Sequence, residues 1–260
     1  MAITIKSQKE IELMREAGHI LAKVHLELEK AIKPGISTWD IDKMGEDLIR
    51  SYGCIPSFKN YNGYPASICV SVNDEVVHGI PNQNRILQEG DIVSLDAGVI
   101  YKGYHSDAAR TYGVGAISKE AQQLIDVTRE SFFRGVEFVK PGNHLRDVAR
   151  GIQEYAESFG YSMVRALVGH GIGAELHESP EIPNFVTPRR GIKLRPGMTL
   201  AIEPMVNEGR YDVVCLDDDW TIVTDDGSLS AHYENTVLVT EDGYEILSLI
   251  GGNDECQKQM

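Results

Sequence analysis

The 260-residue chain repeats part of its own pattern 107 positions further along. The matched segments are Lys33-Pro34-Gly35 with Lys140-Pro141-Gly142, Asp40 with Asp147, Tyr52-Gly53 with Phe159-Gly160, Leu87 with Leu194, Gly90 with Gly197, and Asp96 with Glu203. A Lys-Pro-Gly stop after a helix is common and could recur by chance. Agreement without gaps from Lys33 to Asp96 favours two similar halves instead, over about residues 33–115 and 140–243. Such halves would be related by an approximate twofold axis.

Local signals give each half the same order of elements. Ser7 and Glu10 form a capping box before an apolar face at helical spacing, and Pro34-Gly35 ends that helix. A second helix is predicted from Ser37 or Thr38 to Gly53, and residues 119–139 and 144–159 repeat the pair. Residues 67–77, 91–112, 199–206, 220–224 and 231–240 are rich in β-formers and broken by Gly or Asp clusters. The sequence therefore predicts an α+β fold of two helix-helix-sheet halves with antiparallel sheet.

The charge balance and the cysteines exclude several classes of partner. Acidic residues number 39 and basic residues 25, a formal net charge of −14, which argues against general binding to nucleic acid. The four cysteines form no Cys-x-x-Cys pair, so neither a zinc ribbon nor a redox dithiol is expected. A leader-like start and a membrane-length apolar run are both missing, so we expect a cytoplasmic protein without a membrane partner.

Acidic residues lie on the predicted strands of both halves. A hairpin closing between Tyr101 and Lys102 would place Asp96 directly opposite Asp107, where like charges repel. A register shift of two would keep both on one face of the sheet, whereas a shift of one would not. Facing carboxylates need a shared proton or a cation, and a divalent ion is the commoner solution. Glu203 and Glu234 form the counterpart pair in the second half.

A histidine completes a candidate metal site. His170 lies among small residues, in Gly169-His170-Gly171-Ile172-Gly173, where a ligand can approach closely. Four carboxylates balance two divalent ions, and oxygen-rich ligation favours Mn, Fe, Co or Zn without choosing among them. A water between such ions could lose its proton near neutral pH. Each acid alone fits a solvated strand residue equally well, so the hypothesis depends on all five residues together.

Several short runs resemble type I methionine aminopeptidases in their compact bacterial form. These runs are His78-Gly79-Ile80-Pro81, Ser94-Leu95-Asp96-Ala97-Gly98, His105-Ser106-Asp107, Gly169-His170-Gly171-Ile172-Gly173, Ile202-Glu203-Pro204 and His232-Tyr233-Glu234-Asn235-Thr236. The resemblance covers about residues 1–250 and implies a pita-bread fold, with residues 1–260 as a single catalytic domain. It implies removal of the N-terminal methionine from nascent chains when the second residue is small.

The resemblance also implies roles for individual residues. The metal ligands would be Asp96, Asp107, His170, Glu203 and Glu234, holding two divalent ions. Catalytic roles would fall to Glu203, as a proton carrier, and to His78 and His177, near the scissile nitrogen and the carbonyl oxygen. The substrate would contact these two histidines and a pocket of Phe58, Tyr61, Tyr64, Cys69 and Trp220. Taken by themselves, the aromatic residues and the histidines fit packed core positions as well.

Two alternatives and two assembly properties complete the expectations. A proline-cleaving aminopeptidase or prolidase of the same fold would use the same five ligands, but such relatives usually carry a large N-terminal domain. A binding module without activity on the same fold would be marked by loss of ligands, and all five are present. We expect a monomer. The basic run from Arg189 to Arg195 is either a solvated loop or a ribosome-docking segment.

Overall fold

The computed structural model describes residues 3–250. Its long helices are α1 (Gln8–Ala31), α2 (Thr38–Ser51), α3 (Lys119–Val136) and α4 (Leu145–Ser158). Each begins where the sequence predicts, and the Ser7–Glu10 capping box is present at the start of α1. The predicted apolar face of α1 is confirmed, because Met14, Leu21 and Leu28 on it are fully buried. Helix α3 ends earlier than predicted, since residues 137–139 form a turn before Pro141.

The strands are shorter and more numerous than the sequence indicates. They are β1 (Ile55–Pro56), β2 (Ile68–Val72), β3 (Glu75–Val77), β4 (Ile92–Tyr101), β5 (Tyr104–Gly113), β6 (Ser162–Met163), β7 (Gly169–Gly171), β8 (Glu178–Ile182), β9 (Thr199–Ile202), β10 (Met205–Asn207), β11 (Val213–Cys215), β12 (Ile222–Thr224), β13 (Ser230–His232), β14 (Asn235–Val239) and β15 (Tyr244–Ile246), with a 3-10 turn η1 (Tyr61–Gly63). Every pairing among them is antiparallel in the described part of the chain. Four of the five predicted β regions each divide into two strands.

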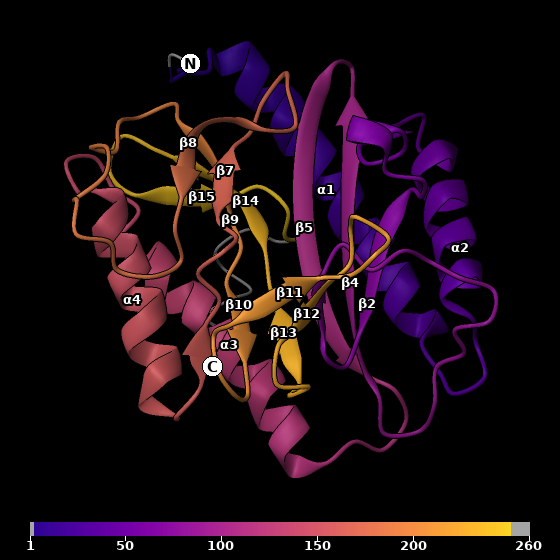
Figure 1. Ribbon diagram of the computed structural model, residues 1–260. Coiled ribbons are helices and arrows are strands. Elements are labelled where there is room, and N and C mark those ends of the chain that lie inside the picture. Colours follow the sequence, from indigo (N-terminus) through magenta and orange to yellow (C-terminus); the bar gives the residue numbers. More distant parts are fainter. Residues whose placement is uncertain (1–2, 251–260) are drawn as a thin grey trace.

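The two halves pack their helices on separate sheets. In the first half, α1 and α2 cover the sheet β1-β4-β2 with β5, and in the second, α3 and α4 pack against the strands around β9, β10 and β14. Figure 1 shows α2 and α4 at opposite edges of the molecule, with β4 and β5 between them. Among the described residues no helix is long and apolar enough to cross a bilayer.

The offset of 107 recurs in the backbone contacts of the two halves. Helix α4 occupies the positions of α2 advanced by that offset. An isolated β-bridge joins Ser37 to Ile86, and its counterpart joins His144 to Lys193. These bridges fix each second helix to the loop before the next sheet, so the halves are pseudo-symmetric in contacts as well as in sequence.

The register of the β4–β5 hairpin differs from the prediction. Its two-residue turn is Lys102-Gly103, whose backbone φ angles are 49° and 87°. Positive φ at both positions gives the turn a twist that matches the right-handed twist of the flanking strands. Asp96 therefore pairs with Ala109, and Asp107 pairs with Gly98. The prediction that Asp96 lies directly opposite Asp107 was wrong by two residues in register, because the hairpin turn lies one residue later than predicted. Both carboxylates still lie on the same face of the sheet.

The acids of the second half do occupy opposed positions. Strand β9 pairs with β14 with Ile202 opposite Asn235, and β10 continues the same register against β13. This register places Glu203 opposite Glu234, although the ladder is interrupted there, at Pro204. The predicted counterpart pair is thus located at the junction between two short ladders.

Backbone contacts join the halves at the same place. The Glu234 N–H donates to the Ala109 carbonyl at 3.0 Å, and the Ala109 N–H donates to the Glu234 carbonyl at 3.4 Å. The Thr236 hydroxyl accepts from the Asp107 N–H at 2.9 Å and donates to the Asp107 carbonyl at 3.0 Å. The seam between the halves therefore runs through residues that carry the acidic cluster.

Candidate functional site

A cavity of about 320 Å³ opens between the two halves. All twelve predicted site residues line it: Phe58, Tyr61, Tyr64, Cys69, His78, Asp96, Asp107, His170, His177, Glu203, Trp220 and Glu234. They come from β2, β4, β5 and β7, from the turn η1 and from loops in both halves. The fold thus brings together residues that are far apart in the sequence.

The acids and His170 form the polar end of this cavity. Ligand atoms of Asp107, His170 and Glu234 all lie within 4.8 Å of one another. His170 Nε2 is 3.9 Å from Asp107 Oδ2 and 3.7 Å from Glu203 Oε1. This spacing allows several of these groups to share one small cation.

Asp96 completes the cluster from the neighbouring strand. It pairs with Ala109 on one side and with Cys69 on the other, both within the central sheet. Leu95 and Ala97, its neighbours in the strand, are buried against the helices, and the alternation of a strand directs Asp96 to the opposite face. Burial raises the pKa of Asp96 to about 7, while a hydrogen bond from Asp107 works in the opposite direction.

The other three carboxyl groups are also costly to ionise. Burial raises the pKa of Asp107, Glu203 and Glu234 well above their usual range, and repulsion among the acids adds to the effect. One buried oxygen each of Asp96, Asp107 and Glu234 has no hydrogen-bond partner. Buried carboxylates without donors are expensive unless a cation compensates them. The donor set therefore fits a hard or borderline divalent metal.

His170 is oriented to contribute a nitrogen. Its Nδ1 lies 2.9 Å from the Gly171 carbonyl, a contact in which the ring nitrogen must be the donor. The proton is then on Nδ1, and Nε2 presents its lone pair to the acids. A Cβ at Gly169 or Gly171 would collide with the Ala201 or Ser179 carbonyl, so glycine is needed on both sides of the histidine. Burial, and then the proximity of His177, lower the pKa of His170 to about 3.

Two further histidines lie beside the cluster. His78 has a left-handed backbone, with φ of 60°, and its ring meets Trp220 edge to face at 6.2 Å. Burial, followed by the influence of His177, lowers the pKa of His78 to about 4. The ring of His177 meets His170 edge to face at 4.1 Å. Both histidines are placed within reach of anything that enters the cavity.

The other end of the cavity is apolar and aromatic. The rings of Tyr64 and Trp220 pack edge to face at 5.1 Å, and the Tyr64 hydroxyl donates to the Gly79 carbonyl at 2.9 Å. Phe58 and Cys69 are buried beside them. Together these residues form an apolar slot that could hold an unbranched apolar side chain.

Sequence reasoning did not name part of the lining. The lining residues that it did not name are Asn62, Val77, Ala166, Leu167, Val168 and Met205. Three of them directly precede Gly169, and Met205 follows Pro204, so adjacency to the candidate ligands was the available signal. None of them carries an ionisable or aromatic side chain, which explains why they were missed.

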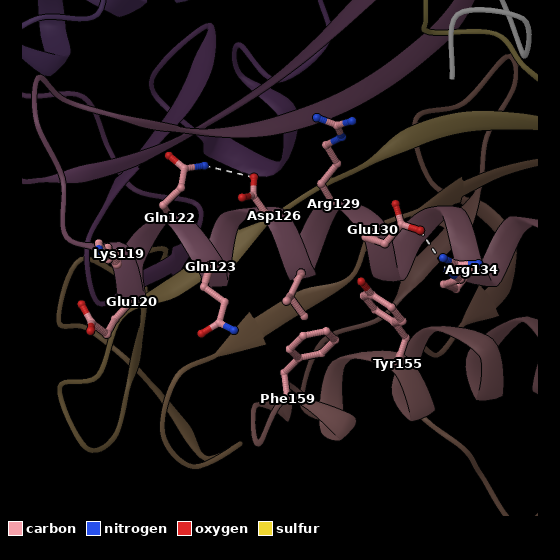
Figure 2. A pocket seen from close by; sticks show the side chains of 11 residues that line it. Lys119, Glu120, Gln122, Gln123, Asp126, Arg129, Glu130, Arg134, Tyr155 and Phe159 are labelled. Carbon is pink, nitrogen blue, oxygen red and sulfur yellow. Dashed lines mark hydrogen bonds and ion pairs between the residues drawn. The ribbon is translucent and has the colours of Figure 1, made fainter. Parts of the chain in front are cut away.

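A larger hollow elsewhere lacks such chemistry. It measures about 870 Å³ and runs along α3 and the end of α4 (Figure 2). Several of its polar groups pair with one another: Arg134 forms an ion pair with Glu130 at 2.9 Å, and Gln122 donates a hydrogen bond to Asp126 at 3.0 Å. The hollow is an open groove on a solvated helix surface, so the smaller cavity is the better candidate site.

Known proteins resemble this chain in both sequence and fold. The model of metallopeptidase family M24 matches residues 12–241. A methionine aminopeptidase from Clostridium acetobutylicum is 58% identical over 247 residues, covering 95% of this chain and 99% of the relative. The crystal structure of methionine aminopeptidase from Thermotoga maritima has a TM-score of 0.93 and 48% identity, covering 95% of this chain and all of its own.

A proline-specific relative is more distant. Xaa-Pro dipeptidase from Bacillus anthracis superposes with a TM-score of 0.74 and 27% identity, and this chain covers 61% of its length. Its additional length agrees with the expectation that proline-cleaving members carry a further domain. With a family model spanning most of its length and a cavity of buried acids and histidine, the chain belongs to metallopeptidase family M24.

Proposed function

We propose that the protein is a methionine aminopeptidase that removes the N-terminal methionine when the second residue is small. The observation that carries the proposal is a cavity in which a cluster of buried acids and histidine adjoins an apolar slot. A volume of about 320 Å³ is near the lower end for ligand pockets. It suits one extended side chain with its adjoining backbone, which favours an exopeptidase.

Divalent metal is part of the proposed activity, with Asp96, Asp107, His170, Glu203 and Glu234 as its ligands. Two ions would balance the four carboxylates, and their donor atoms agree with Mn, Fe, Co or Zn. When bound, divalent ions supply polarisation of the scissile carbonyl and a nucleophile at neutral pH. The buried carboxyl oxygens of Asp96, Asp107 and Glu234 that have no hydrogen-bond partner support this assignment.

Side chains of the cavity would carry the remaining steps. Glu203, which lies 3.7 Å from His170, would accept the proton of the attacking water and pass it to the leaving amine. His177 would donate a hydrogen bond to the carbonyl oxygen as negative charge develops there. His78 would contact the scissile nitrogen. The wall around Trp220 would hold the methionine side chain.

Peptide cleavage tests the proposal directly. Purified protein with added Mn²⁺ or Co²⁺ should cleave Met-Ala-Ser and Met-Gly-Ser, but hardly Met-Leu-Ser, because a bulky second side chain would collide with the rim of the cavity. Leu-Ala-Ser should be cleaved far more slowly than Met-Ala-Ser. Equal cleavage of Met-Ala-Ser and Met-Leu-Ser would contradict the size rule. Preference for X-Pro peptides would instead support a proline-cleaving enzyme.

A histidine variant separates substrate contact from metal binding. His78→Ala should lower turnover of Met-Ala-Ser by about 10-fold or more while metal content stays near that of the wild type. The metal should be retained because His78 is proposed to meet the substrate and not the ions. Loss of metal in proportion to activity would assign His78 to the metal site instead.

Broader properties of the protein are proposed on the same basis. Nascent polypeptide N-termini would be the natural substrates, processed in the cytoplasm by a monomer formed from one catalytic domain over residues 1–260. Arg189, Arg190, Lys193 and Arg195 are exposed along one segment, which supports a role in ribosome docking. Co-sedimentation with ribosomes at low and high salt tests this segment.

A further inference from the structure

A direct contact joins the wall of the cavity to one of its histidines. The Tyr61 hydroxyl lies 2.8 Å from His177 Nδ1. The two rings also meet edge to face, with centroids 5.2 Å apart and an interplanar angle of 68°. If Tyr61 only packed against the methionine side chain of the substrate, its aromatic ring would be sufficient. The hydrogen bond of the Tyr61 hydroxyl to His177 therefore needs a separate explanation.

The acid–base chemistry of the pair favours one direction for this hydrogen bond. Burial and the nearby Glu175 charge raise the pKa of Tyr61, although a hydrogen bond with the Asn62 side chain opposes them. The phenol therefore keeps its proton at neutral pH. A phenol O–H is a stronger donor than an imidazole N–H, and a ring nitrogen lone pair is a stronger acceptor than a phenol oxygen. Tyr61 should donate, and Nδ1 should accept.

The backbone around Tyr61 is held in a fixed conformation. Tyr61 begins the turn η1, between Asn60 and Asn62, which have left-handed φ values of 66° and 49°. Its N–H donates to the Phe58 carbonyl at 2.9 Å, and its carbonyl accepts from the Tyr64 N–H at 2.9 Å. Non-glycine residues in this region cost energy and persist where the surroundings require them. The strained turn thus fixes where the Tyr61 hydroxyl can reach.

His177 is held from its other sides as well. Its ring meets His170 at 90°, with centroids 4.1 Å apart. The next residue, Glu178, forms a nearly buried ion pair with Lys6 at 2.6 Å. The ring position is therefore determined by several contacts, and the hydrogen bond to Tyr61 determines which ring nitrogen carries the proton.

We propose that Tyr61 is a positioning residue that holds His177 in the tautomer with its proton on Nε2. A neutral imidazole has one N–H and one lone pair, so acceptance at Nδ1 makes Nε2–H the donor. That donor is what a carbonyl oxygen needs as negative charge develops. The inference rests on the proposed function, because it is the proposed contact of His177 with the carbonyl that requires this tautomer.

The tautomer can be measured without activity. Two-bond ¹⁵N–¹H correlations of histidine-labelled full-length protein distinguish the two neutral forms, before and after loading with Zn²⁺, and a His177→Asn spectrum assigns the signal. Wild type should show His177 with its proton on Nε2, and Tyr61→Phe should show a mixture of tautomers. Tyr64→Phe is the matched control, because Tyr64 lines the same cavity but its hydroxyl donates to backbone carbonyls instead of to a histidine. A Nδ1–H form in wild type, or an unchanged tautomer in Tyr61→Phe, overturns the proposal.

Kinetics add a second readout. Because Tyr61→Phe keeps the ring, KM for Met-Ala-Ser should change little while kcat falls by about 3- to 10-fold, the usual effect of one hydrogen bond. In a His177→Ala background the same substitution should have almost no further effect, since its target is gone. Additive losses in the double variant would reduce Tyr61 to a wall residue. A wild type that cleaves no Met-Ala-Ser would refute the proposed function, while the tautomer measurement would still decide the role of Tyr61.

Discussion

Replacing Asp96 by asparagine should affect the metal-free and the metal-loaded protein in opposite directions. Burial raises the pKa of this carboxyl to about 7 from an ordinary value of 3.8. A raised pKa means that the folded state binds the proton more tightly than the unfolded state. The resulting stability is fully present below pH 3.8 and is lost as the pH rises through about 7. At pH 8, without a cation, the ionised carboxylate opposes folding.

The size of the effect follows from the difference between the two pKa values. A difference of about three pH units corresponds to about 4 kcal/mol in the free energy of unfolding. For a domain of this size, 1 kcal/mol changes Tm by about 2–4 °C. Asp96 and Asp107 share a hydrogen bond, so part of the charge penalty remains with Asp107 after the substitution. We expect Asp96→Asn to raise the Tm of chelator-treated protein at pH 8 by about 5–10 °C.

The assay is thermal unfolding followed by circular dichroism at pH 5.5 and pH 8. Metal-free wild type should be more stable at pH 5.5, whereas metal-free Asp96→Asn should depend less on pH. Adding Mn²⁺ should stabilise wild type strongly and the variant weakly, because the variant lacks one charge of the proposed ligand set. Asp47→Asn, an exposed acid on α2, is the matched control for loss of one negative charge. If metal-free Asp96→Asn is less stable than metal-free wild type at pH 8, the reasoning is refuted.

Three further predictions concern the metal, the wall and the surface. Asp107→Asn should lower bound metal, measured by elemental analysis, and reduce turnover by about 100-fold or more; full retention of both would exclude it as a ligand. Gly98→Ala should destabilise the protein by about 1–3 kcal/mol, measured in urea, because its Cβ would lie 2.7 Å from Ser57. Arg189→Glu with Arg190→Glu should weaken salt-sensitive ribosome co-sedimentation without changing peptide cleavage, and unchanged sedimentation would leave the segment as a solvated loop.

Local signals were sufficient to predict the four long helices, and the repeat relates α2 to α4. Helix starts depend on local caps and on apolar spacing, so the pairs α1–α2 and α3–α4 could be read from adjacent residues. The offset of 107 also anticipated that Asp96 and Glu203 occupy related positions. The family resemblance then identified the remaining site residues, and all of them line one cavity.

Other features depend on contacts that no local pattern contains. The register of β4 and β5 was set by the left-handed φ of Lys102, a conformation that its residue type does not announce. The three-residue strand β7 pairs with the nearby β8 and also, across a gap of some thirty residues, with β9. The contact between Tyr61 and His177 joins two separate loops. Each of these features was decided by tertiary packing.

The seam at Ala109 and Glu234 has a consequence for how the site is acquired during synthesis. Asp96 and Asp107 belong to the first half, whereas His170, Glu203 and Glu234 come from the second. A nascent chain that has reached only residue 200 holds the first two acids and His170 but neither glutamate. If the proposed ligands hold the metal, its full capture would have to wait for β14 to dock against β5. An ion bridging these donors would act as a cross-link between halves and would report that folding of the chain is complete.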